Sequence, residues 1–290
     1  MFSRVEDFFR PNDEQPTFLF FFRVMIGIIA LVDLLSLLPD LPLIYGDTPA
    51  LGPSGLLYLQ TDDFQYLHPI RMFLDQYGLL GYLDPGLLLL YGGVLVFLIR
   101  GLVTRPVALV ALLLHFFIYK SFSNLNYGFD FFTSMSLFYC LLFPVGKAYS
   151  LDNLLLRNRP PVQFNYKRML LLHVSIAYLY TGIAKAIDIE WYTGEGLWRA
   201  LTNVDTDFYA LPPVVLLLGC WATLIIELSH PFLIWHEKTK HLALLGVIGL
   251  HLGIAYTMGL VHFSAIMIVW NVAAIATFRT EKAVAHEMAI

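Results

Sequence analysis

The stretch that decides the fold of this chain is residues 169–198, MLLLHVSIAYLYTGIAKAIDIEWYTGEGLW. It begins with an apolar run of helix length that ends near a lone lysine, Lys185. The length and apolarity of this run predict a membrane span, with Lys185 at or just inside the lipid boundary. An ionisable group at that depth costs about 2.5–3.5 kcal/mol on insertion scales. Lys185 therefore marks a functional site, unless its long side chain only reaches out to the headgroups.

The composition of the whole chain is that of a membrane protein. It is 58% hydrophobic and only 14% charged, and its mean hydropathy is +0.67. Average soluble domains are about 45–50% apolar and about 25% charged. The excess lies in runs of helix length and not in alternating segments, which favours an all-α polytopic membrane protein over a β-barrel. The net charge of −4 argues against a nucleic-acid partner.

Eight apolar runs are long enough to consider as spans. They are approximately residues 17–38, 85–99, 106–122, 129–145, 169–186, 213–235, 242–260 and 262–275. The last two are nearly continuous, so they form either two spans with a tight turn or one long, broken helix. We expect a single transmembrane domain over residues 1–290, built as a bundle of about eight helices in a lipid bilayer.

The distribution of basic residues predicts the orientation of these spans. With a cytoplasmic N-terminus, 13 of the 18 Lys and Arg residues lie in inner segments and four on the outer side, while Arg23 lies at the inner end of the first span. The positive-inside rule then places both termini in the cytoplasm, in what we expect to be a bacterial inner membrane. Two long outer loops, residues 39–84 and 187–212, are predicted to hold short interfacial helices.

Several polar residues on different runs are predicted to lie near the outer side or at mid-span. They are Asp33, Asn124, Asn126, Asp130, Lys185, Asp188 and His251. Polar groups in a helical bundle face its interior and pair with one another. We therefore expect one outward-facing polar pocket in which Lys185 can serve as a general base.

Glu227 and His230 form an E-x-x-H pair in ELSHP of the sixth run, toward its inner half. Di-metal bundles need two such motifs and two further carboxylates, and the sequence contains one motif. We therefore expect no metal site, and predict instead a Glu–His or Glu–Arg pair that holds helices together. Nucleophile elbow, phosphate-binding loop, dinucleotide fingerprint and HExxH motifs do not occur.

Two segments carry a family resemblance: FSNLNYGFDFFTSMSLFYCLLFPVGKAYSLD (residues 122–152) and HVSIAYLYTGIAKAIDIEWYTGEGL (residues 173–197). Their motif residues are Asn126, Gly128, Asp130, Phe143 and Pro144 in the first, and Tyr178, Gly182, Lys185, Trp191 and Gly194 in the second. In this order they resemble the HTTM domain, the membrane domain shared by vitamin K-dependent γ-carboxylases and many bacterial proteins. The resemblance covers essentially the whole chain, and Arg23 and Asp33 fit its weaker N-terminal signal.

The resemblance implies a role for Lys185. The carboxylase lysine at this position is the proposed base that deprotonates vitamin K hydroquinone, so a reduced quinone is the expected cofactor. His251 matches a histidine of a later span and is the second expected catalytic residue. The expected substrate-binding residues are Asp33, Asn124, Asn126, Asp130, Asp188 and Trp191.

The chain also departs from the family pattern. It keeps one of two paired lysines, as Ala184-Lys185, and has Asn124-Leu125-Asn126 where the family has a histidine. It ends at Ile290, so we expect the large lumenal domain of the eukaryotic enzyme to be absent. This pattern resembles the stand-alone bacterial members of the family.

Two functions follow as alternatives. One is a carboxylase-like lyase or oxidoreductase in which Lys185 acts as the base on a quinol or peptide substrate. The other is a non-catalytic membrane partner that binds a lipid, quinone or peptide for maturation or export. A small transporter is disfavoured, because the sequence shows no inverted repeat.

Overall fold

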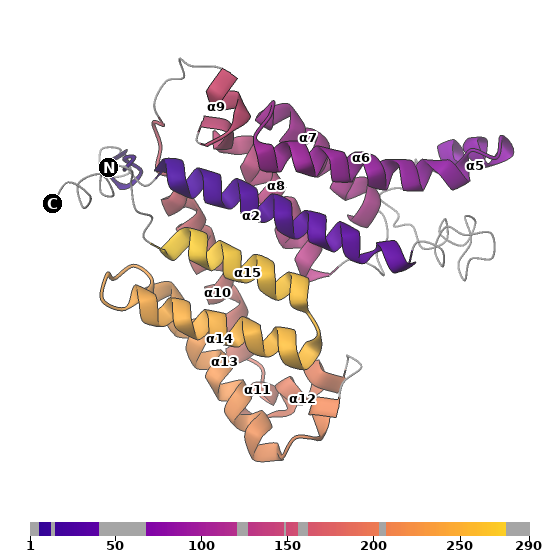
Figure 1. Cartoon of the computed structure of the whole chain (residues 1–290). Helices are drawn as coiled ribbons and strands as arrows, with labels where there is room; N and C mark the ends of the chain where they lie inside the picture. Colours follow the sequence, from indigo (N-terminus) through magenta and orange to yellow (C-terminus); the bar gives the residue numbers. More distant parts are fainter. Residues whose placement is uncertain are drawn as a thin grey trace. The chain divides into compact units, whose positions relative to one another are not determined.

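The structure is a computed structural model that describes residues 6–12, 15–40, 68–120, 127–147, 149–155, 162–202 and 207–276. Regular structure in these ranges is helical, with no strand. The long helices are α2 (Gln15–Ser36), α6 (Leu80–Arg100), α7 (Thr104–His115), α8 (Gly128–Leu142), α10 (Tyr166–Ala186), α13 (Pro213–Leu233), α14 (Lys240–Met258) and α15 (Val261–Ile275) (Figure 1). Each apolar run overlaps one of them, so the prediction of helices at these positions is confirmed.

The helices differ in their ability to cross a membrane. Four are long and apolar enough, namely Gln15–Asp40, Tyr166–Ala186, Pro213–Leu233 and Lys240–Met258. The shorter apolar helices are Pro85–Arg100, Thr104–Tyr119, Gly128–Leu142 and Val261–Ile275. The chain therefore has the helices of a membrane protein. The bundle of about eight spans stays a prediction.

The chain divides into two compact units, and each is described by itself. The first unit consists of Met1–Phe18 and Pro161–Ile290, and the second consists of Leu19–Pro160. The first unit contains α10, α13, α14 and α15. The second contains most of α2 together with α6, α7 and α8. The single domain expected over residues 1–290 stays a prediction.

The four long helices of the first unit pack in pairs. Helix α10 contacts α13 and α15, and α14 contacts α13 and α15. Gly182 permits a close approach of α10 to α13, because a Cβ atom there would lie 3.2 Å from the backbone nitrogen of Leu228. Helices α14 and α15 are separate and form a hairpin, since Gly259 between them has a left-handed φ of 68° (Figure 1). The two runs therefore form two helices and not one long, broken helix, and that both of them cross the bilayer stays a prediction.

Short helices occupy the described parts of the two long loops. Helices α11 (Glu190–Thr193) and α12 (Glu195–Thr202) pack against α13, and α5 (His68–Gln76) precedes α6 in the second unit. Between α11 and α12, Gly194 has a left-handed φ of 94° and lies close to the backbone of Leu217. The Leu197 N–H donates to Cys220 Sγ at 3.3 Å. The predicted short helices exist, and their interfacial position stays a prediction.

In the second unit, buried charged side chains form hydrogen bonds with backbone groups. Helix α7 packs against α6 and α8 and continues as the π-helix η3 (Phe116–Lys120). Arg23 of α2 is only 1% exposed and donates to the carbonyls of Val145 and Tyr149 at 3.0 and 2.8 Å. The Asp152 carboxylate accepts the N–H groups of Val103 and Thr104 at 2.7 and 2.9 Å, at the start of α7. These bonds fix the loops that join the helices.

Candidate functional site

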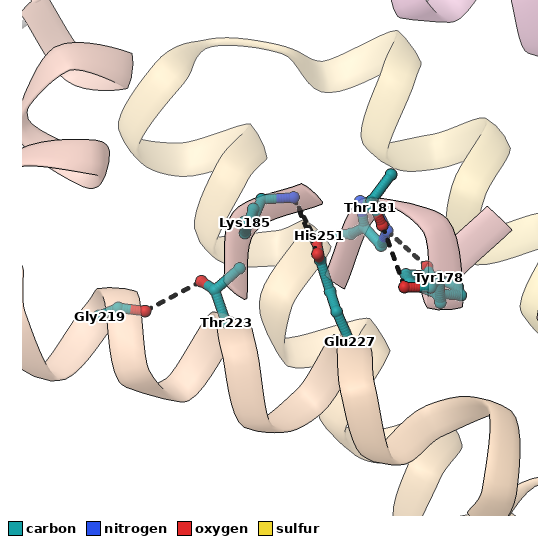
Figure 2. A network of polar contacts seen from close by, with 7 residues as sticks. All are labelled: Tyr178, Thr181, Lys185, Gly219, Thr223, Glu227 and His251. Atoms are coloured by element: carbon teal, nitrogen blue, oxygen red, sulfur yellow. Dashed lines mark hydrogen bonds and ion pairs between the residues drawn. The ribbon is translucent and has the colours of Figure 1, made fainter. Parts of the chain in front are cut away.

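Lys185 lies in the last turn of α10 and forms an ion pair with Glu227 of α13. Its ammonium nitrogen is 2.9 and 2.8 Å from the two carboxylate oxygens (Figure 2). The Lys185 side chain is 23% exposed and that of Glu227 is 9% exposed. The close approach of α10 and α13 at Gly182 explains the pairing, because Lys185 follows Gly182 by three residues and Glu227 adjoins Leu228.

The segment after α10 folds back over Lys185. The Trp191 ring centroid lies 5.2 Å from Lys185 Nζ, within the range of a cation–π contact. Trp191 in turn lies against Gly196, where a Cβ atom would come within 2.9 Å of the ring. Asp188 accepts the Glu190 N–H at 3.1 Å and so shapes the turn into α11. The carboxylate that pairs with Lys185 is therefore that of Glu227.

A second polar group lies on the same helix as Lys185. The Tyr178 hydroxyl is 2.8 Å from His251 Nε2, and Asn271 Nδ2 donates to Tyr178 at 3.0 Å. The Oδ1 atom of Asn271 is 2.9 Å from His230 Nε2. These four side chains are buried, and they come from α10, α14, α15 and α13 in turn. Each long helix of the first unit thus contributes one member of a hydrogen-bonded chain.

The ion pair and the hydrogen-bonded chain belong to one site. Lys185 interacts electrostatically with His251, and Glu227 with Tyr178. Figure 2 shows Lys185 and Glu227 facing each other beside the Tyr178–His251 contact. We define the lysine site as Lys185, Glu227, Tyr178, His251, Asn271 and His230. Its amine, carboxylate, phenol and imidazole groups can all hold or transfer a proton.

The structure brings some of the predicted site residues together. Lys185 and His251 share the lysine site. Asp33 and Asp130, both buried in the second unit, interact electrostatically with each other. Asp130 also accepts the Tyr127 N–H at 2.8 Å and caps α8. Asn124 and Asn126 lie outside the described residues, and the convergence of all these groups in one pocket stays a prediction.

The partner predicted for Glu227, a histidine or an arginine, is wrong. Glu227 pairs with Lys185, and His230 bonds to Asn271 instead of to a charged partner. The error came from placing Glu227 toward the opposite side from Lys185. The first turns of α13 lie beside α11 and α12, so Glu227 is level with the end of α10. Among the described residues, no three His, Cys, Asp or Glu side chains come together as metal ligands.

Sequence reasoning missed Asn271 altogether. It is a lone amide in the apolar segment VHFSAIMIVWNVAAI, and it is fully buried. Such a side chain has to face other helices and find partners there. That signal was present in the sequence.

Comparisons with protein-family models, curated proteins and solved structures find no match to this chain.

Proposed function

We propose that this chain is a vitamin K-dependent γ-carboxylase-like integral membrane protein in which Lys185 acts as the base on a quinol or peptide substrate. The observation that supports this function is the Lys185–Glu227 pair, which is partly exposed and adjoins the Tyr178–His251 contact. The Lys185 side chain is partly exposed, and two further groups able to carry protons, Tyr178 and His251, lie next to the pair.

The residues at this position suit a reduced quinone. Trp191 offers an aromatic face beside Lys185 Nζ, and the donor set consists of groups that exchange protons with hydroxyls. When bound, a reduced quinone supplies a hydroxyl whose proton a base can remove. Lys185 and Trp191 are the residues that would hold it.

Glu227 gives Lys185 a way to become a base. The ammonium can pass one proton to a Glu227 carboxylate oxygen, which leaves a neutral amine beside a neutral acid. The Lys185 amine then accepts the substrate proton and is an ammonium again, next to the new negative charge. Burial disfavours a charged pair relative to water, so it reduces the cost of this proton transfer.

A non-catalytic membrane partner that binds a lipid, quinone or peptide is the second candidate. The observation that favours it is the contact of Lys185 with both carboxylate oxygens and with the Trp191 ring. The same contacts are expected of a lysine whose only role is to hold α10 against α13 through its charge.

Replacement of Lys185 by arginine separates the two candidates, because arginine keeps the charge and cannot serve as a base. The assay is oxidation of 2-methyl-1,4-naphthohydroquinone by the purified protein, followed as oxygen uptake. If Lys185 acts as the base, the Lys185→Arg substitution should lower the rate of quinol oxidation by at least about 100-fold. The exposed Lys238→Arg variant is the matched control. A Lys185→Arg protein that keeps its rate would support the partner function, to be followed by analysis of co-purified lipids and quinones.

We propose further that the chain has eight spans, with both termini in the cytoplasm of a bacterial cell. The charge asymmetry of the sequence supports this arrangement. Reporter fusions at residues 60, 150, 205 and 285 are expected to read outside, inside, outside and inside. An external reading at 285 would contradict the proposed topology.

A further inference from the structure

The orientation of the Asn271 amide fixes the direction of the buried hydrogen-bonded chain. Its side-chain nitrogen is 2.8 Å from the Met267 carbonyl oxygen and 3.0 Å from the Tyr178 hydroxyl. A carbonyl only accepts, so the atom that faces Met267 must be the donating nitrogen. The amide oxygen then faces His230 Nε2, which donates to it at 2.9 Å.

The same logic assigns the hydrogen of Tyr178 and the tautomer of His251. The Tyr178 oxygen accepts from Asn271, and among the described residues the acceptor within reach of its own hydrogen is His251 Nε2 at 2.8 Å, so donation to Nε2 is the arrangement that leaves no hydroxyl hydrogen unpaired. A nitrogen that accepts carries no hydrogen, and the neutral His251 ring therefore has its hydrogen on Nδ1. Donation thus runs from His230 through Asn271 and Tyr178 to His251.

The Nδ1–H group of His251 is buried and has no hydrogen-bond partner among the described residues. His251 is 3% exposed, and its ring packs edge-on against Phe263 at 5.6 Å between centroids. Buried N–H groups without an acceptor are rare and costly, and each calls for an explanation. In the proposed reaction, Lys185 becomes an ammonium beside a neutral Glu227 acid once it has taken the substrate proton, and its charge, which acts on His251, then makes a negatively charged oxygen the fitting acceptor.

We infer that His251 donates a hydrogen bond from Nδ1 to a substrate oxygen that carries negative charge, such as that of an aryl oxyanion. This inference rests on the proposed function, in which Lys185 creates that charge by removing a proton. His251 is then a donor to the anion and not a base. Tyr178, Asn271 and His230 are positioning residues, because they hold the His251 tautomer that leaves Nδ1–H available.

The first test measures the tautomer directly. Full-length protein labelled with ¹⁵N-histidine is placed in lipid nanodiscs, and His251→Leu identifies the His251 signals. The expected spectrum shows a neutral ring with its hydrogen on Nδ1. Tyr178→Phe removes the donor to Nε2 and is expected to give a mixture of both tautomers. A doubly protonated ring, or a hydrogen on Nε2 in the unsubstituted protein, would overturn the inference.

The second test uses 4-nitrophenolate as the oxyanion, at a pH where it is already ionised and needs no base. Its binding should move the Nδ1–H signal of His251 downfield. His251→Leu should weaken its binding by about 10-fold, the lower end for a hydrogen bond to a charged group. The exposed His241→Leu variant should bind it as tightly as the unsubstituted protein. An unmoved signal, or undiminished binding in His251→Leu, would refute the donor role.

The base role of Lys185 and the donor role of His251 can be refuted independently of each other. Lys185→Arg keeps a positive charge, so it should still bind 4-nitrophenolate if His251 is the donor, even where quinol oxidation is lost. Retained quinol oxidation in Lys185→Arg, together with a His251 response to 4-nitrophenolate, would refute only the base.

Discussion

Lys185 in the first unit and Arg23 in the second are both basic side chains on apolar helices, and they are bound in opposite ways. Arg23 is 1% exposed and its guanidinium donates to two backbone carbonyls. The Lys185 side chain is 23% exposed and contacts another ionisable side chain, Glu227. A backbone carbonyl cannot take up a proton, whereas a carboxylate can. The difference indicates that Arg23 serves the architecture of its unit and Lys185 can serve chemistry.

The largest effect on stability is expected at Arg23. Arg23→Met removes the donors of the Val145 and Tyr149 carbonyls and the positive charge that interacts with Asp152. We expect a loss of about 3 kcal/mol in the free energy of unfolding, the lower end for breaking a buried charge interaction. The measurement is reversible unfolding in mixed micelles, with the exposed Lys238→Met as control. A loss below about 1 kcal/mol would remove the structural role assigned to Arg23.

A smaller effect on stability is expected when the Lys185–Glu227 pair is replaced as a whole. The double variant Lys185→Met/Glu227→Leu leaves no charge without a partner, so its free energy of unfolding should stay within about 1 kcal/mol of the original. Lys185→Met alone isolates the Glu227 carboxylate and should be less stable than the double variant. Quinol oxidation should be lost in both. If the double variant unfolds as readily as Arg23→Met, the contrast between the two basic residues does not hold.

An effect of similar size is expected at the helix contact that positions the pair. In Gly182→Ala, the new Cβ atom would lie 3.0 Å from Leu228 Cδ2 and 3.2 Å from its backbone nitrogen. We expect a loss of about 1 kcal/mol, the lower end for overpacking, with a lower quinol oxidation rate because Lys185 shifts relative to Glu227. Gly249→Ala on α14 is the matched control, since no described atom outside its own helical turns lies within 4 Å of its Cβ position. It should be neutral or slightly stabilising, because alanine favours helix.

The helices were predictable from the sequence, because the backbone N–H and C=O groups of a long apolar run have to form hydrogen bonds with one another, and a helix satisfies them. The runs at residues 169–186 and 213–235 coincide with α10 and α13 to within three residues at each end. Lys185 was also predictable as the residue to examine, since a lone charge at the end of such a run needs a reason.

The partners of Lys185 were not predictable in the same way. Residue position along a span gives depth only if neighbouring helices begin at the same level, and α13 begins beside α11 and α12 instead. The contact of Gly182 with Leu228, which sets the level of Glu227, joins segments 46 residues apart. Asn271 could have been found as a lone amide, but its bonds to Tyr178 and His230 depend on how three other helices pack.

The α14–α15 hairpin has a consequence for how the protein is made. Helix α15 has 15 residues and rises only about 22 Å, less than the hydrocarbon core of about 30 Å. Only Gly259 and Leu260 separate α14 from α15, and both helices are synthesised after α10 and α13. Tyr178, His230 and His251 are therefore synthesised before Asn271, which lies on the last described helix. The hydrogen-bonded chain of these four side chains can form only once α15 has been synthesised and has packed against α10 and α14.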